Sequence, residues 1–218
     1  MKAVEVSFRW RIRGHLHIGT GMSRLGEADR LIRLDAQKTP IIDGEQVKGA
    51  VRGAAERLIR WLGATVESSE TDSYPRHPVL VRIFAPRPDA LIRFEPARMD
   101  LNQTRRAVQL ASTAIGSGGA ADEHTLRVIE ALEAGAEFQG KVSLYGAWKT
   151  EQDRQDLRFL GAAILACEGI GGRKGVGFGR IECLSLVCKG ATPELNFDVL
   201  ANSQTIVHMR AALAAGGK

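Results

Sequence analysis

The chain has 218 residues, of which 44% are hydrophobic and 25% are charged, with a formal net charge of +5. These values are typical of a globular protein that buries a proper core, and the modest positive charge matters only if it is clustered on one surface. The three cysteines form no Cys-x-x-Cys pair, the first residues include no apolar leader, and no run approaches the ~18 apolar residues of a membrane span. We therefore expect a cytoplasmic protein that is neither exported nor membrane-inserted.

The first predicted element is a strand over 4–12, where apolar and polar residues alternate strictly. Its polar face carries three arginines, Arg9, Arg11 and Arg13. If the strand continues through Leu16, His15 and His17 join that face. A His-x-His pair on a strand can bind a metal, contact RNA or simply be a polar surface feature, and the metal interpretation needs further ligands that the sequence does not offer.

A short hairpin is predicted over 31–42, and a helix begins at Asp43-Gly44-Glu45. The helix is predicted from apolar residues at intervals of three or four, namely Val47, Val51, Ala54, Leu58 and Trp61. Lys48 and Arg52 lie near its N-terminus, where free backbone N–H groups and the helix dipole also favour anions. The alternative is an ordinary solvated charged face.

The middle of the chain is less regular. Val79–Phe84 is a short apolar segment of unassigned type, and 91–95 is a predicted strand. Residues 100–122 show no clear period, and a long irregular insertion in a compact domain tends to be functional. The alternating runs 126–132 and 138–145 predict a hairpin around Ala134-Gly135, although 126–132 is equally compatible with a helix.

A second helix is predicted over 152–167, followed by a loop over 169–180 and a strand over 181–187. The loop has six glycines in eleven positions and the cations Arg173 and Lys174, so its backbone could lie close to an anionic ligand. It matches neither common phosphate signature, since no Ser or Thr follows Gly-Lys and the loop opens a strand. The alternative is a tight turn that packs a helix against a strand.

The order strand, helix, strands, helix, strand predicts an α+β fold with a ferredoxin-like βαββαβ core that is elaborated by insertions. Without repeats or linkers, we expect one domain over 1–218. The core covers 1–190, an insertion covers 100–135, and a tail covers 191–218, which includes a possible helix over 197–213 with no assigned role.

Four features together resemble the RAMP (repeat-associated mysterious protein) superfamily of CRISPR systems. They are Gly14-His15-Leu16-His17-Ile18-Gly19 after the first strand, the stretch 40–52 that leads into the first helix, Leu132-Glu133-Ala134-Gly135-Ala136-Glu137-Phe138 before a strand, and the glycine-rich loop. Over nearly the whole chain, their order resembles the small backbone subunit of type III effector complexes.

This resemblance implies several copies stacked along a guide RNA, together with other effector subunits and a complementary target RNA. The insertion would be a thumb, formed by a hairpin or a loop, that disrupts the guide–target duplex at regular intervals. By position, His17, Lys48 and Arg52 correspond to guide-backbone contacts, and Arg173 and Lys174 are further candidates. A positively charged groove that tracks phosphates without reading bases suits a guide of any sequence.

The resemblance also implies a catalytic aspartate after the first strand, which places Asp29 at that position and Asp35 at a structural position in the following turn. Glu27 is the alternative carboxylate. Asp29 would help to activate the 2′-hydroxyl of the target RNA, with a divalent metal, Mg²⁺, compensating charge. The alternatives are a catalytically inactive RNA-binding scaffold, a metal-independent guide-processing ribonuclease that uses His15 or His17, and a small-molecule enzyme that uses the glycine-rich loop.

Overall fold

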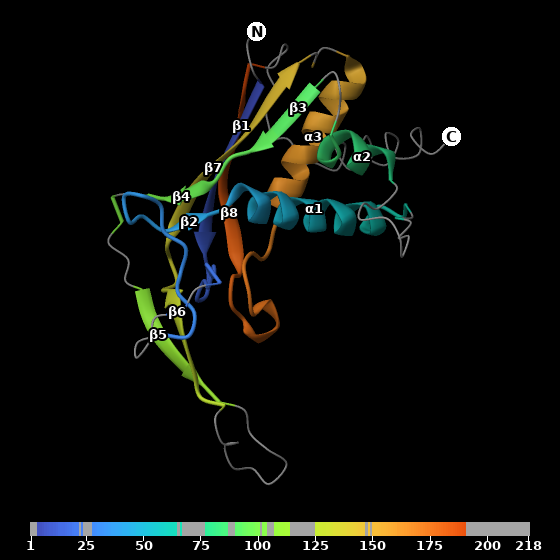
Figure 1. The fold of residues 1–218 in the computed structure, drawn as a ribbon. Helices are drawn as coiled ribbons and strands as arrows, with labels where there is room; N and C mark the ends of the chain where they lie inside the picture. Colours follow the sequence, from blue (N-terminus) through green and yellow to red (C-terminus); the bar gives the residue numbers. More distant parts are fainter. Residues whose placement is uncertain are drawn as a thin grey trace.

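The computed structural model describes residues 4–21, 23, 28–64, 66, 77–86, 90–100, 102–103, 107–113, 125–146, 148 and 150–190. Within these residues the main sheet is antiparallel and has the order β2-β4-β7-β1-β8, with β3 also paired to β7 (Figure 1). Its strands are β1 (Val4–Ile12), β2 (Ile41–Ile42), β3 (Ala90–Phe94), β4 (Ala97–Met99), β7 (Glu137–Gly146) and β8 (Ile181–Lys189).

This order confirms the predicted ferredoxin-like core. β1 lies between β7 and β8, and β3 and β4 together occupy the place of the second core strand beside β7. The alternation predicted for β1 is confirmed as well, because Val4, Val6, Phe8, Trp10 and Ile12 are all buried. A central strand with one apolar face therefore anchors the core.

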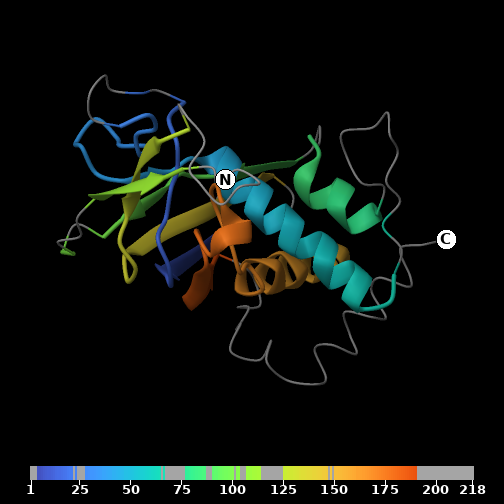
Figure 2. The same ribbon diagram turned by 90° about the horizontal axis from the view of Figure 1, so that it is seen from below.

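The helices α1 (Gly44–Trp61) and α3 (Glu151–Leu165) confirm the two predicted helices, and they lie on the same side of the sheet (Figures 1 and 2). α3 begins with a reciprocal capping box between Thr150 and Asp153. The segment whose type the sequence left open is the short helix α2 (Pro78–Phe84), which follows the N-cap residue His77.

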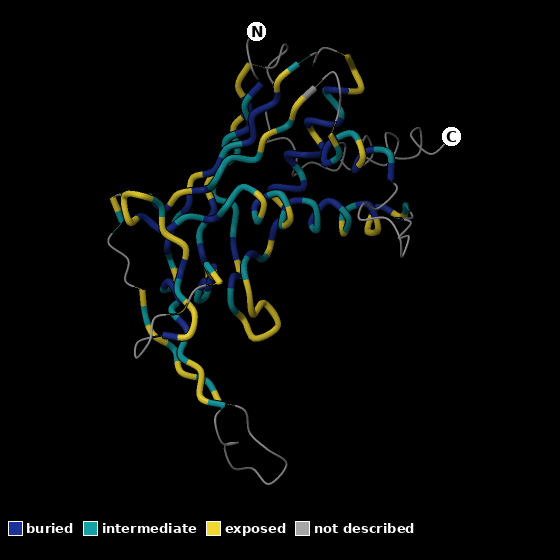
Figure 3. Tube along the Cα trace, viewed as in Figure 1, coloured by how far each residue is buried: buried dark blue, intermediate teal, exposed yellow. Residues whose placement is uncertain are grey.

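A second, two-stranded sheet projects from the main sheet and is called here the thumb hairpin (Figure 1). It consists of β5 (Ala107–Ser112) and β6 (Arg127–Leu132), so residues 107–112, which show no clear period in the sequence, form one strand of a hairpin. Its strands are largely exposed or half-buried, and β6 is buried toward its base (Figure 3). The thumb hairpin is therefore most deeply buried at its base.

The prediction that 126–132 pairs with 138–145 is wrong. β6 pairs with β5, whereas β7 pairs with β1. Gly135, with φ of 89°, donates its N–H to Ile12 O, and the chain passes from the small sheet directly into the main sheet at this turn. The tail 191–218, with its possible helix, lies outside the described residues.

Candidate functional site

The glycine-rich loop folds against the segment that follows β1. Gly179 donates its N–H to His15 O at 2.7 Å, and Gly172 donates its N–H to His17 O at 3.2 Å. Gly171 has φ of 79°, and a side chain there would begin 2.7 Å from His17 O. The backbone of the glycine-rich loop therefore lies close to the backbone of the segment after β1. This agrees with the interpretation of the loop as a tight turn.

His17 is buried, with only 4% of its surface exposed, and this contradicts the expectation of a histidine on the outer face of a strand. β1 ends at Ile12, and Leu16 instead exchanges backbone hydrogen bonds with Leu132 of β6 at 2.8 and 2.9 Å. This pairing turns His17 toward the base of the thumb hairpin. Its Nδ1 lies 2.7 Å from Glu130 O.

Asp29 is exposed and is also bonded to β6 of the thumb hairpin. Its backbone N–H donates to Val128 O at 2.8 Å, and its Oδ2 accepts a hydrogen bond from Val128 N at 2.7 Å. Among the described residues, Oδ1 has no recorded partner. The Asp29 residue is exposed, while Glu27 lies outside the described residues.

Glu130 links these two candidates, and no sequence pattern indicates this role. Its carbonyl oxygen faces His17 Nδ1, its backbone N–H donates to Arg30 O at 2.9 Å, and its Oε2 accepts from Ile32 N at 2.9 Å. In the sequence Glu130 is one acid in an alternating run. Only the fold shows that it joins the segment after β1 to the segment that carries Asp29.

Arg173 connects the glycine-rich loop to the thumb hairpin. It adopts a left-handed backbone conformation with φ of 59°, and its Nη2 donates to Ser112 Oγ at 3.2 Å. Arg173 and Lys174 are both exposed, and Lys174 begins a short 3-10 turn, Lys174–Val176. Both cations remain accessible to an anionic ligand at the tip of the loop.

Lys48 and Arg52 lie on α1, in its first half, and both are half-buried. Arg52 forms an ion pair with Glu56, with Nε 3.1 Å from Oε1. For Lys48 no ion pair with another described residue is recorded. No direct contact joins these two side chains to His17 or Asp29 in the described part of the chain, so the structure places them as a separate pair of cations.

Asp35 has the structural position that the resemblance implied. Its Oδ1 accepts hydrogen bonds from Gln37 N and Thr39 N, both at 2.9 Å. These bonds close the turn of the predicted hairpin, in which Leu34 bridges Pro40. The turn sets the path of the chain from Asp29 into α1.

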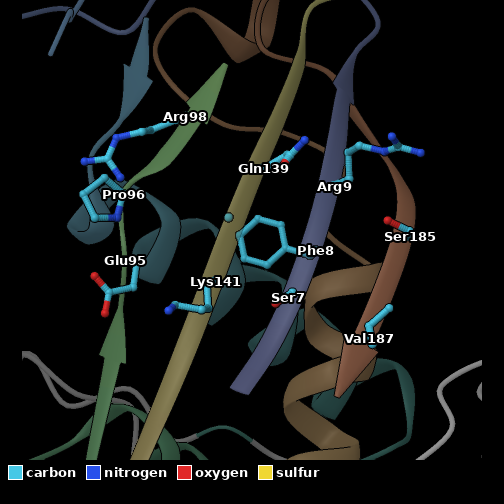
Figure 4. Close-up of a pocket in the computed structure, with 11 residues that line it drawn as sticks. Ser7, Phe8, Arg9, Glu95, Pro96, Arg98, Gln139, Lys141, Ser185 and Val187 are labelled. Atoms are coloured by element: carbon cyan, nitrogen blue, oxygen red, sulfur yellow. The ribbon is translucent and has the colours of Figure 1, made fainter. Parts of the chain in front are cut away.

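A second feature is a groove of about 740 Å³ that involves β1, β4, β7 and β8 (Figure 4). It is lined by three cations, and each lies near an acid: Arg9 is 3.7 Å from Glu137, Arg98 is 3.5 Å from Asp35, and Lys141 is 3.3 Å from Glu5. These charges balance one another. The groove is therefore less suited to a phosphate backbone than the base of the thumb hairpin.

The described residues contain no cluster of three or more His, Cys, Asp or Glu side chains that could hold a metal ion. Asp29 alone supplies one available carboxylate oxygen. A solitary carboxylate binds Mg²⁺ weakly unless a substrate phosphate and water complete the coordination.

The sheet, the two covering helices and the projecting hairpin define an elaborated ferredoxin-like domain. Residues 11–182 match the RAMP superfamily, and since this is most of the chain, the protein belongs to that superfamily. A search of curated proteins found no match. No described helix is both long and apolar enough to cross a membrane.

The fold is similar to a chain in the cryo-EM structure of the type III-B Cmr-beta bound to cognate target RNA. The sequence identity is 18% and the TM-score is 0.59. The similarity covers 86% of this chain and 61% of that chain, so this protein spans less than two thirds of its neighbour's length.

Proposed function

We propose that this protein is an RNA-binding backbone subunit of a type III CRISPR effector complex, assembled with further copies of itself and other effector subunits. Membership of the RAMP superfamily and the fold of a chain from an RNA-bound type III-B structure support this function. The observation that carries it is the convergence of His17, Asp29 and Arg173 on one thumb hairpin. These residues come from three distant parts of the sequence.

Binding in this proposal depends on the sugar-phosphate backbone. Lys48, Arg52, Arg173 and Lys174 contact phosphates of the guide, and none of them needs to read a base. Because phosphate contacts release counterions, the affinity falls as the salt concentration rises. Sequence selection then comes from base pairing between guide and target RNA.

The proposed reaction is cleavage of the target RNA through Asp29. The carboxylate takes up the proton of a ribose 2′-hydroxyl, whose oxygen attacks the adjacent phosphorus while the 5′-oxygen of the next nucleotide leaves with a proton from water. The products are a 2′,3′-cyclic phosphate and a 5′-hydroxyl. Asp29 is suited to this role because the residue is exposed and the Val128 N–H holds Oδ2 in place.

We further propose that Mg²⁺ takes part beside Asp29, held mainly by the RNA rather than by the carboxylate oxygen that takes up the proton. The ion would neutralise charge on the phosphate. The RNA phosphate and water would supply the other oxygen ligands, since the described residues offer no second carboxylate in a metal-binding cluster.

The test is cleavage of a guide-complementary RNA by the assembled complex with Mg²⁺, comparing the native subunit with Asp29→Asn, Asp29→Ala and Glu27→Ala. Asp29→Asn retains an oxygen that can accept from Val128 N but removes the negative charge. We expect both Asp29 variants to lose cleavage while target binding is retained. Native-like cutting by both would eliminate Asp29, and cutting lost only in Glu27→Ala would transfer the role to Glu27.

The same experiment separates the alternatives. RNA binding without cutting by the native complex would leave a structural subunit without catalysis. Cleavage of repeat RNA by the isolated protein in EDTA would instead indicate a metal-independent guide-processing ribonuclease that uses His15 or His17.

A further inference from the structure

The two ring nitrogens of His17 have different surroundings. Nδ1 lies 2.7 Å from Glu130 O, and a carbonyl oxygen can only accept, so Nδ1 carries a proton and donates it. In the neutral ring this bond fixes the tautomer, and Nε2 then has a lone pair and no proton. Nε2 is thus a hydrogen-bond acceptor with a fixed direction.

Nε2 has no recorded hydrogen-bond partner among the described residues, although 96% of the surface of His17 is buried. Four polar side-chain atoms in the described part of the chain are both enclosed and unpaired, and Nε2 is not one of them. Nε2 is therefore not completely enclosed. An unpaired acceptor on an otherwise enclosed ring indicates a position for an external donor.

Glycines leave this nitrogen uncovered. A side chain at Gly19 would begin 3.0 Å from Nε2, and one at Gly172 would begin 3.8 Å from Cδ2 of the same ring. The ring therefore lies next to Gly19 on one side and next to Gly172, in the loop that carries Arg173 and Lys174, on another. A ligand held by these cations can bring a donor to Nε2.

We propose that Nε2 of His17 accepts a hydrogen bond from a ribose 2′-hydroxyl of the bound RNA, which makes His17 a residue that selects RNA over DNA. This inference rests on the proposed function, in which RNA lies at the base of the thumb hairpin. Phosphate oxygens are acceptors and cannot donate to Nε2. The 2′-hydroxyl is the donor that every nucleotide of the RNA backbone provides, whatever its base, and DNA lacks it.

Two substitutions at His17 distinguish the role of Nδ1 from the role of Nε2. In His17→Asn, the amide nitrogen occupies the position of Nδ1 and keeps the bond to Glu130 O, but nothing replaces Nε2. In His17→Gln, the amide oxygen reaches the position of Nε2 and can still accept from a hydroxyl. A third variant, Gly19→Ala, covers Nε2 with a methyl group and leaves the Glu130 bond in place.

The experiment measures binding of the full chain to a single-stranded RNA and to its 2′-fluoro analogue at one salt concentration, by fluorescence anisotropy. The analogue keeps the sugar pucker and the phosphates but cannot donate. We expect the native protein to prefer RNA by roughly 3- to 10-fold, the effect of one hydrogen bond. His17→Asn and Gly19→Ala should lose this preference, and His17→Gln should retain it.

Equal binding of the two oligonucleotides by the native protein would overturn the inference, as would a native preference in a folded His17→Asn variant. Equal loss of affinity for both oligonucleotides in His17→Asn would indicate a phosphate contact instead and would also overturn it. Failure to bind either oligonucleotide would contradict the proposed function itself. If His17→Asn does not fold, Gly19→Ala decides the question.

Discussion

The Asp29 carboxylate accepts a hydrogen bond from the backbone N–H of Val128 at 2.7 Å, so the candidate catalytic side chain is also an attachment point for the thumb hairpin. A loss of activity in Asp29→Ala alone is therefore ambiguous. It can result from the lost charge or from a displaced hairpin.

The two roles of Asp29 predict different stabilities for two variants. Asp29→Ala removes the acceptor for Val128 N and should lower the free energy of unfolding by about 1 kcal/mol, whereas Asp29→Asn keeps an acceptor and should change it little. Urea denaturation and hydrogen exchange at the Val128 amide measure the difference. Unchanged exchange at Val128 in Asp29→Ala would contradict the attachment.

The helical layer contains a buried ion pair between α2 and α3. Arg82 donates from Nε and Nη2 to the two carboxylate oxygens of Asp156 at 2.7 and 2.9 Å, and the Asp156 side chain is 1% exposed. Asp156→Ala leaves the guanidinium of Arg82, whose side chain is 29% exposed, without this partner and should cost about 2 kcal/mol of unfolding free energy, measured by urea denaturation.

The control for Asp156 is Glu151, an exposed acid at the start of α3 that pairs with Arg154. Glu151→Gln should leave the urea midpoint nearly unchanged, because exposed pairs contribute little. Similar midpoint shifts in Asp156→Ala and Glu151→Gln would show that burial does not strengthen the Arg82 pair.

The environment of His77 leads us to expect that the free energy of unfolding depends on pH. Its Nδ1 accepts from Val79 N at the start of α2, and burial, followed by the charge of Arg82, lowers the pKa of His77 below the ordinary value of 6.5. The fold favours the neutral ring, so the stabilisation is present above pH 6.5 and is lost as the pH falls through the lowered pKa.

The variant His77→Asn retains an N-cap acceptor but does not titrate. We expect the native protein to lose more stability than His77→Asn between pH 8 and pH 5, as measured by urea midpoints. Parallel losses in the two proteins would assign the pH dependence to other groups.

The proposed phosphate contacts predict changes in salt dependence. For a single strand, each lost phosphate contact should reduce the slope of log affinity against log salt concentration by about 0.7. Lys48→Ala and Arg173→Ala should each show this reduction in a titration with RNA. Lys141→Ala, in the charge-balanced groove, should not, and an equal reduction there would place RNA on that face of the sheet.

Local sequence patterns predicted the individual helices and strands whose own residues show a regular apolar period. The alternation of 4–12 specified β1, and the spacing of apolar residues specified α1 and α3, because burying one face imposes a period on the residues themselves. The strand that pairs with β6 could not be predicted from such a local pattern. The alternation of β6 is satisfied equally by β5 or β7 as a partner, and only the tertiary structure shows that the partner is β5.

The sequence alone thus determined a ferredoxin-like core and a set of candidate residues, since periodicity and motif order are local properties of the chain. The tertiary structure alone decided that His17 is buried, that Glu130 joins His17 to the segment after Asp29, and that Arg173 reaches Ser112. These contacts join residues from 61 to 113 positions apart. No local pattern specifies such pairs, because they form only when the packed sheet brings its loops and the thumb hairpin together.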